Sequence, residues 1–143
     1  MTTFPERLRA LHQQTPGRVA VTLQFSNADD LSLTVEQLLA GAGSYARAYQ
    51  RAGIQPGEVV VLILQHGEEL VYAFWGAILH GAIPSIMPFL TEKLSPERYR
   101  ADLSALISVT QPAAIVTYPE FEVEVRSALQ AGDSVRAVVV SNQ

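Results

Sequence analysis

Only a few residues in this 143-residue sequence have a type and spacing that could carry chemistry. His66 lies in a Gln-His-Gly stretch directly after an aliphatic run, and Arg98 and Arg100 follow a Ser-Pro-Glu helix start. Ligands of open α/β sheets bind at the carboxyl ends of strands, and arginine suits phosphate groups. We therefore take His66 as a candidate ligand contact and the two arginines as candidate contacts for a phosphate group. Their plainer interpretations are a solvated loop and a solvated helix face.

Two glycines resemble a nucleotide-binding pattern but stand in the wrong place for it. Gly41 and Gly43 fit G-x-G-x-x-A, which needs a turn from strand to helix. Here they fall within a helical apolar period, where small residues let a helix approach its neighbour closely. The one lysine, Lys93, has no glycine loop around it, so the sequence contains no phosphate-binding loop of the G-x-x-x-x-G-K type.

Metal and acid–base sites are not indicated either. The three histidines share no ligand spacing, and no serine stands in a G-x-S-x-G elbow. Glu120, Glu122 and Glu124 are two residues apart, a spacing that sends side chains in different directions on a helix. Spacing alone therefore yields no catalytic constellation.

Composition narrows the class of protein. Ten Lys and Arg against 14 Asp and Glu give a formal net charge of −4, with 48% apolar residues. An acidic chain with scattered cations is a poor nucleic-acid binder, and the absence of cysteine excludes disulfide scaffolds and thiolate metal sites. The N-terminus lacks the apolar core of a signal peptide. The apolar stretch from Val71 to Leu79 is too short for a membrane span. We expect a soluble, cytoplasmic protein.

The first half predicts a helix, a β-hairpin and a βα unit. Alternating apolar residues mark the hairpin strands, and Thr34 with Gln37 forms a capping box before a helix that ends at Gly53. An unbroken aliphatic run predicts a strand buried on both faces, and Gly81 is well placed just past the next helix. The predicted elements are a helix over 3–14, strands over 19–25 and 31–33, a helix over 34–52, a strand over 58–64 and a helix over 68–80.

The second half continues the alternation. Prolines shorten a strand over 83–88, a loop follows over 89–94, and Ser95 with Pro96 begins a helix that runs to Gln111. Strands are predicted over 113–118 and 135–140. The segment between them alternates like a strand, but the Glu122/Arg126 spacing favours a helix. The order predicts an α/β fold in which an N-terminal helix and hairpin precede a mainly parallel sheet with helices on both faces.

Taken together, several stretches resemble the N-terminal part of the adenylate-forming superfamily, which includes acyl-CoA synthetases, fatty-acyl-AMP ligases and peptide-synthetase adenylation domains. LTVEQL over 33–38 resembles the opening L-[TS]-Y-x-E-L motif, with a valine in place of the aromatic. GIQPGEVV over 53–60 resembles G-[VI]-x-x-G-D-x-V, and LHGAIPSIMP over 79–88 resembles L-x-A-G-A-x-x-V-P-[LI]. The resemblance implies that residues 1–143 form an N-terminal subdomain, a fragment of a larger domain.

The family's reaction is an ATP-dependent activation of a carboxylic acid to an acyl-adenylate, followed by transfer to a thiol. The resemblance therefore implies ATP, Mg²⁺ and either coenzyme A or a carrier protein's phosphopantetheine for the full-length enzyme. In some members, residues near the helix that follows the motif matched here by 79–88 contact the CoA nucleotide, so Arg98 and Arg100 are the candidates here. The partners implied are the remainder of the ligase chain and the acid substrate.

The family's Ser/Thr/Gly-rich phosphate loop and catalytic lysine match nothing here. We therefore expect this chain alone to be non-catalytic, to hold no cofactor, and to self-associate through exposed apolar surface or an open sheet edge. The alternative is a free-standing, non-catalytic α/β module that binds a protein or a small ligand. No membrane span and no nucleic acid are expected in either case.

Overall fold

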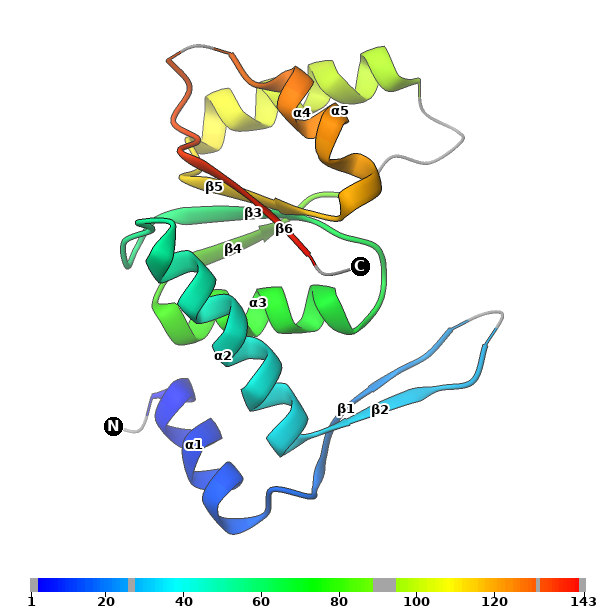
Figure 1. Ribbon diagram of the computed structural model, residues 1–143, viewed down its shortest axis with the longest axis vertical. Coiled ribbons are helices and arrows are strands. Elements are labelled where there is room, and N and C mark those ends of the chain that lie inside the picture. Colours follow the sequence, from blue (N-terminus) through cyan, green and yellow to red (C-terminus); the bar gives the residue numbers. More distant parts are fainter. Residues whose placement is uncertain (1–2, 26–27, 89–94, 131, 142–143) are drawn as a thin grey trace.

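The computed structural model describes residues 3–25, 28–88, 95–130 and 132–141 (Figure 1). The predicted loop over 89–94 lies outside the described residues. The elements in chain order are α1 (Phe4–Gln14), β1 (Val19–Leu23), β2 (Leu31–Thr34), α2 (Val35–Arg51), β3 (Val59–Ile63), α3 (Glu68–His80), β4 (Ile83–Ile86), α4 (Pro96–Thr110), β5 (Ala114–Thr117), a 3₁₀ turn (Pro119–Phe121), α5 (Glu122–Ala128) and β6 (Ala137–Val140).

The main sheet is parallel throughout, with the strand order β4-β3-β5-β6. Val60 of β3 lies opposite Pro84 on one side and Ala114 on the other. The β1–β2 pair forms a separate antiparallel hairpin. Residues 60–63 are fully buried, as expected for a central parallel strand between helices. The predicted α/β fold is confirmed.

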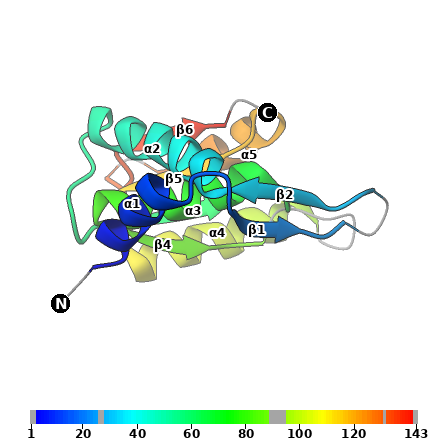
Figure 2. The ribbon, with the colours of Figure 1, turned by 90° about the horizontal axis from the view of Figure 1, so that it is seen from below.

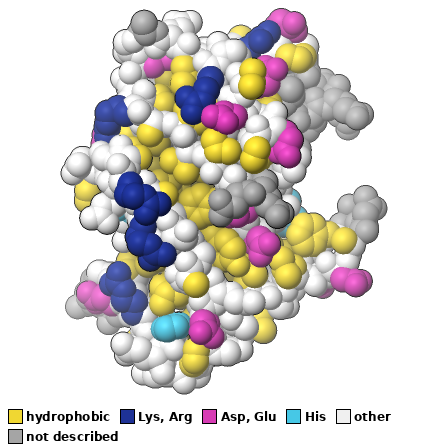
Figure 3. Space-filling model, viewed as in Figure 1, with side chains coloured by type: hydrophobic (Ala, Val, Ile, Leu, Met, Phe, Trp, Pro, Cys, Tyr) yellow, Lys and Arg dark blue, Asp and Glu magenta, His cyan; other side chains and the backbone are white. Residues whose placement is uncertain are grey.

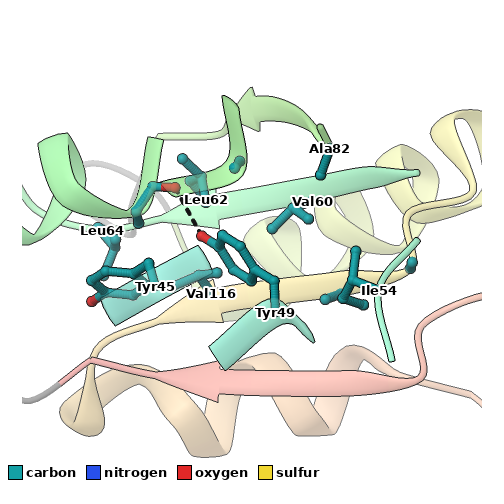
Figure 4. Close-up of a cluster of buried hydrophobic side chains, with 12 residues drawn as sticks. Tyr45, Tyr49, Ile54, Val60, Leu62, Leu64, Ala82 and Val116 are labelled. Carbon is teal, nitrogen blue, oxygen red and sulfur yellow. Dashed lines mark hydrogen bonds between the residues drawn. The ribbon is translucent and has the colours of Figure 1, made fainter. Parts of the chain in front are cut away.

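Helices cover both faces of the sheet (Figure 1). Tyr49 of α2 packs with Val60 and Ala73 on one face (Figure 4), and its hydroxyl donates a hydrogen bond of 2.8 Å to the Ala73 carbonyl oxygen. Tyr99 and Leu103 of α4 pack with α5 on the other face. Each cluster buries one side of the strands, so two apolar layers enclose the sheet.

A third apolar cluster lies on the outer side of α2 and α3. It joins Leu8 of α1, Val35 and Leu38 of α2, and Trp75 of α3. In Figure 2, α1 and the hairpin lie nearest the viewer, in front of α2 and α3. Helix α3 is therefore sandwiched, which accounts for its wide apolar arc.

Local signals begin and end the helices where the sequence predicts them. The Thr34 hydroxyl accepts a hydrogen bond from the Gln37 amide at 3.1 Å, and the Gln37 side chain accepts from the Thr34 amide at 2.9 Å. Gly81 follows α3 with φ 90°, a left-handed conformation that favours glycine. The Glu122–Arg126 ion pair, at 2.8 Å, lies on a helix, which is the structure that the spacing of these two residues favours. The strand predicted from residue 135 begins at Ala137 instead.

Candidate functional site

The carboxyl end of β3 lies beside a cavity of about 270 Å³. Strand β3 leads into Leu64, Gln65 and His66, and Tyr118 comes from the end of the neighbouring strand β5. Parallel strands of an α/β sheet present their carboxyl ends together, and ligands of such folds bind there. The cavity is therefore the candidate site that this topology favours.

The β1–β2 hairpin supplies the opposite wall of this cavity. Phe25 and Leu31 both line it. His66 Nε2 lies 2.9 Å from the Gln24 carbonyl oxygen, and the His66 ring packs against Phe25 with centroids 5.0 Å apart. His66 thus lines the cavity, and it also links the hairpin to the rest of the protein. The sequence indicated only a connecting loop, because local alternation does not show which loop a hairpin will meet.

Carboxylates border the cavity at the start of α3. Glu69 accepts a hydrogen bond of 2.9 Å from the Tyr45 hydroxyl, and Glu68 accepts one of 3.5 Å from Tyr72. Burial raises the pKa of the Tyr45 phenol, and the neighbouring Glu69 charge raises it further. Both tyrosines therefore act as neutral donors that hold the carboxylates in place.

The cavity has the wrong electrostatics for a polyphosphate. Glu68 and Glu69 line it, whereas no arginine or lysine of the described ranges does. Carboxylates repel phosphate oxygens at this distance scale, and phosphate sites use cations or oriented amides instead. The lining instead suits a neutral ligand, with Phe25, Leu64 and Tyr118 as apolar or aromatic walls.

The structure does not bring the two candidate arginines to His66. Both lie on α4, which covers the other face of the sheet from α3. Arg100 forms ion pairs with Glu124 at 3.6 Å and Glu97 at 4.0 Å, the first of which links α4 to α5. The exposed Arg98 side chain has no partner among the described residues. Of the pair, Arg98 is thus the one available to a ligand.

Other site types find no support in the residues that the structure describes. No group of three or more His, Asp or Glu side chains there could hold a metal ion. Among those same residues, no helix has both the length and the apolar character needed to cross a membrane.

Gly41 lies where α2 packs against α3, and not in a nucleotide-binding turn between a strand and a helix. A Cβ added there would lie 2.4 Å from the Tyr72 ring of α3. The glycine therefore serves the close approach of two helices, as the helical apolar period indicated.

The comparisons with known proteins point to a family through one family model. A family model described as AMP-binding enzyme matches residues 8–143. The hybrid PKS-NRPS synthetase pyvA of Aspergillus violaceofuscus is 32% identical over 83 residues, which make up 57% of this chain and 2% of that protein.

Solved structures share the fold. A fatty acid AMP ligase from Legionella pneumophila matches with a TM-score of 0.74 and 18% identity, over 97% of this chain and 23% of its own. A benzoate CoA ligase from Burkholderia xenovorans matches with a TM-score of 0.70 and 22% identity, over 99% and 26%. The chain thus spans about a quarter of the length of these solved ligases.

Proposed function

The chain belongs to the family of AMP-binding enzymes, and from that membership we propose that the protein containing it activates a carboxylic acid with ATP and passes the acyl group to a thiol. In the first step, a carboxylate oxygen attacks the α-phosphorus of ATP and pyrophosphate leaves. In the second, a thiolate attacks the acyl carbon of the adenylate and AMP leaves. Mg²⁺ would neutralise phosphate charge in the first step, and the thiol would be that of coenzyme A or of a phosphopantetheine arm. We place the reaction in the cytoplasm.

Within that reaction, we assign this chain a structural role, as a scaffold that forms one wall of a ligand-binding site. The single observation behind this proposal is the cavity at the carboxyl end of β3, whose carboxylates disfavour phosphate and whose Phe25 and Tyr118 offer apolar contact. The sequence contains one lysine, Lys93, and no glycine-rich phosphate loop around it. In this proposal, other parts of the enzyme therefore bind ATP. His66 stays a proposed ligand contact at the cavity wall.

The experiment is ATP–pyrophosphate exchange. The purified 143-residue chain is expected to exchange label no faster than a sample without protein, with a panel of carboxylic acids present. The same chain extended by its natural downstream sequence, if the gene continues, is expected to exchange label with at least one acid. Exchange by the short chain would overturn the scaffold role. Its absence in the extended protein would overturn the ligase proposal.

We also propose that Arg98 and Arg100 contact the phosphates of coenzyme A in the extended enzyme. Because Arg100 already pairs with Glu97 and Glu124, Arg98→Ala should raise the KM for coenzyme A more than Arg100→Ala does. Arg126→Ala is the matched control, since Arg126 is exposed and pairs with Glu122 of the same helix, α5. An unchanged KM in both α4 variants would remove the arginines from the site.

A further inference from the structure

An apolar groove of about 430 Å³ lies away from the candidate site, where α1, β1 and the start of α2 meet. Its floor includes Leu8, Leu11 and Leu38, and Trp75 reaches it from α3. Its wall at β1 is open to water, because the Val19 side chain is 52% exposed. The groove therefore presents apolar surface, a tryptophan and an open side, features typical of protein-binding sites.

The rim of the groove is positively charged in a chain that is acidic overall. Arg7 and Arg18 line it, and no Asp or Glu does among the described residues. Residues 1–28 hold three arginines against one glutamate, while the whole chain has a net charge of −4.

The rim arginines are also unpaired. Neither the Arg7 nor the Arg18 side chain has an ion-pair partner among the described residues, whereas Arg100, Arg126 and Arg136 each pair with a glutamate. Positive charge is thus left uncompensated beside apolar surface.

We propose that this groove binds an acidic, amphipathic helix of a partner protein. The apolar stripe of such a helix would cover Leu11, Val19 and Trp75, and its carboxylates would meet Arg7 and Arg18. This is the recognition mode in which helical side chains at spacings of three and four residues fill an apolar groove. The flanking charges would set the orientation and the rate of association.

The open side of the groove favours a helix over a fatty carboxylate. Small-molecule sites bury most of their ligand, but an acyl chain lying along the exposed Val19 would keep one side in water. An amphipathic helix keeps only its polar face in water. Arg7 on α1 and Arg18 before β1 come from two different elements, and a helix with several carboxylates can meet both.

Trp75 provides the measurement, because it is the sole tryptophan of the chain and it lines the groove. The probe is a synthetic helical peptide with leucines at spacings of three and four and glutamates on both flanks. Titration into the full chain should shift the Trp75 emission and saturate. The same peptide with lysines in place of the glutamates should bind at least several-fold more weakly.

Matched variants test the site itself. Val19→Asp should weaken binding by more than roughly tenfold, whereas Val109→Asp should not, because Val109 is 82% exposed and lies on α4. Arg7→Ala and Arg18→Ala should each weaken binding roughly two- to fivefold, as for exposed ion pairs, and Arg51→Ala should leave it unchanged. Circular dichroism checks that each variant is folded.

Three outcomes would overturn the proposal. They are no saturable change with the acidic peptide, equal binding of the lysine peptide, and equal loss in the Val19 and Val109 variants. Binding of dodecanoate in place of the peptide would assign the groove to a fatty carboxylate and would also overturn it. None of these readouts depends on ligase activity, so they are independent of the function proposed above.

Discussion

At the scale of single residues, Glu58 is the carboxyl group whose pKa the fold alters most among the described residues. Arg136, just before β6, donates hydrogen bonds to both carboxylate oxygens of Glu58, one at 2.8 Å, and the Gln55 amide donates another at 2.7 Å. Chiefly because of the Arg136 hydrogen bonds, the pKa of Glu58 falls from 4.5 to about 2. Arg136 also donates to the Gly53 carbonyl oxygen, so it fastens β6 to the turn before β3.

This contact predicts an acid-sensitive contribution to stability. A carboxyl whose pKa is lower in the folded state stabilises the fold above its unfolded value, here 4.5, and loses that effect as the pH falls toward 2. At pH 7, the urea midpoint should therefore be lower for Glu58→Gln than for the unaltered chain. When the same measurement is repeated down to pH 2, the two midpoints should converge below about pH 4. Asp102→Asn, at an exposed position of α4, is the control. A gap between the Glu58 variant and the unaltered chain that stays constant down to pH 2 would contradict the assignment.

At the scale of elements, Gly41 and Gly76 determine how closely α2 and α3 pack. A Cβ added at Gly76 would lie 2.6 Å from the Tyr45 Cβ and 2.8 Å from the Ala42 carbonyl oxygen. Backbone and a buried side chain block it, so the helices would have to separate. At Gly43, on the same helix as Ala42, the nearest atom would be a flexible Arg47 nitrogen at 3.5 Å.

Gly76→Ala should accordingly destabilise the protein by about 1–3 kcal/mol, the usual cost of overpacking. Gly43→Ala should be neutral or stabilising by up to ~1 kcal/mol, because alanine is the better helix former. Thermal or urea unfolding of both variants measures this contrast. Equal effects at the two positions would show that helix propensity, and not the close packing of α2 against α3, governs the changes in stability.

The sequence predicts elements well where their signals are local. The Thr34 capping box, Gly81 and the buried aliphatic run of β3 each depend on neighbours within a few residues, and each is confirmed. The Glu122/Arg126 spacing resolves a segment whose alternation suggested a strand. Local signals do not predict the cavity, because Phe25 and Tyr118 are 93 positions apart and meet only through tertiary packing. No local pattern brings such residues together.

At the scale of the whole molecule, the two edges of the sheet differ in their protection. Figure 1 shows β6 at the front, and no strand of the described ranges pairs with its outer side. Figure 3 shows hydrophobic side chains gathered across the middle of this face, among scattered charges. The other edge strand, β4, contains Pro84, which lacks an amide proton. Strand β6 has the sequence AVVV, with neither proline nor charge.

Unprotected, β-branched edges pair with other strands, so we predict that the chain self-associates through β6 as its concentration rises. The Ser141 amide, just after β6, donates to the Thr117 carbonyl oxygen of β5, and backbone alternation therefore turns the Val140 amide outward. Val140→Pro should remove that donor and leave the β5 ladder intact, lowering the association constant measured by sedimentation velocity. Ile86→Pro makes the matching change on β4, where the neighbouring Met87 amide donates inward to Leu62, and should leave association unchanged. If the unaltered chain stays monomeric at millimolar concentration, or if both proline variants weaken association alike, β6 is not the pairing edge.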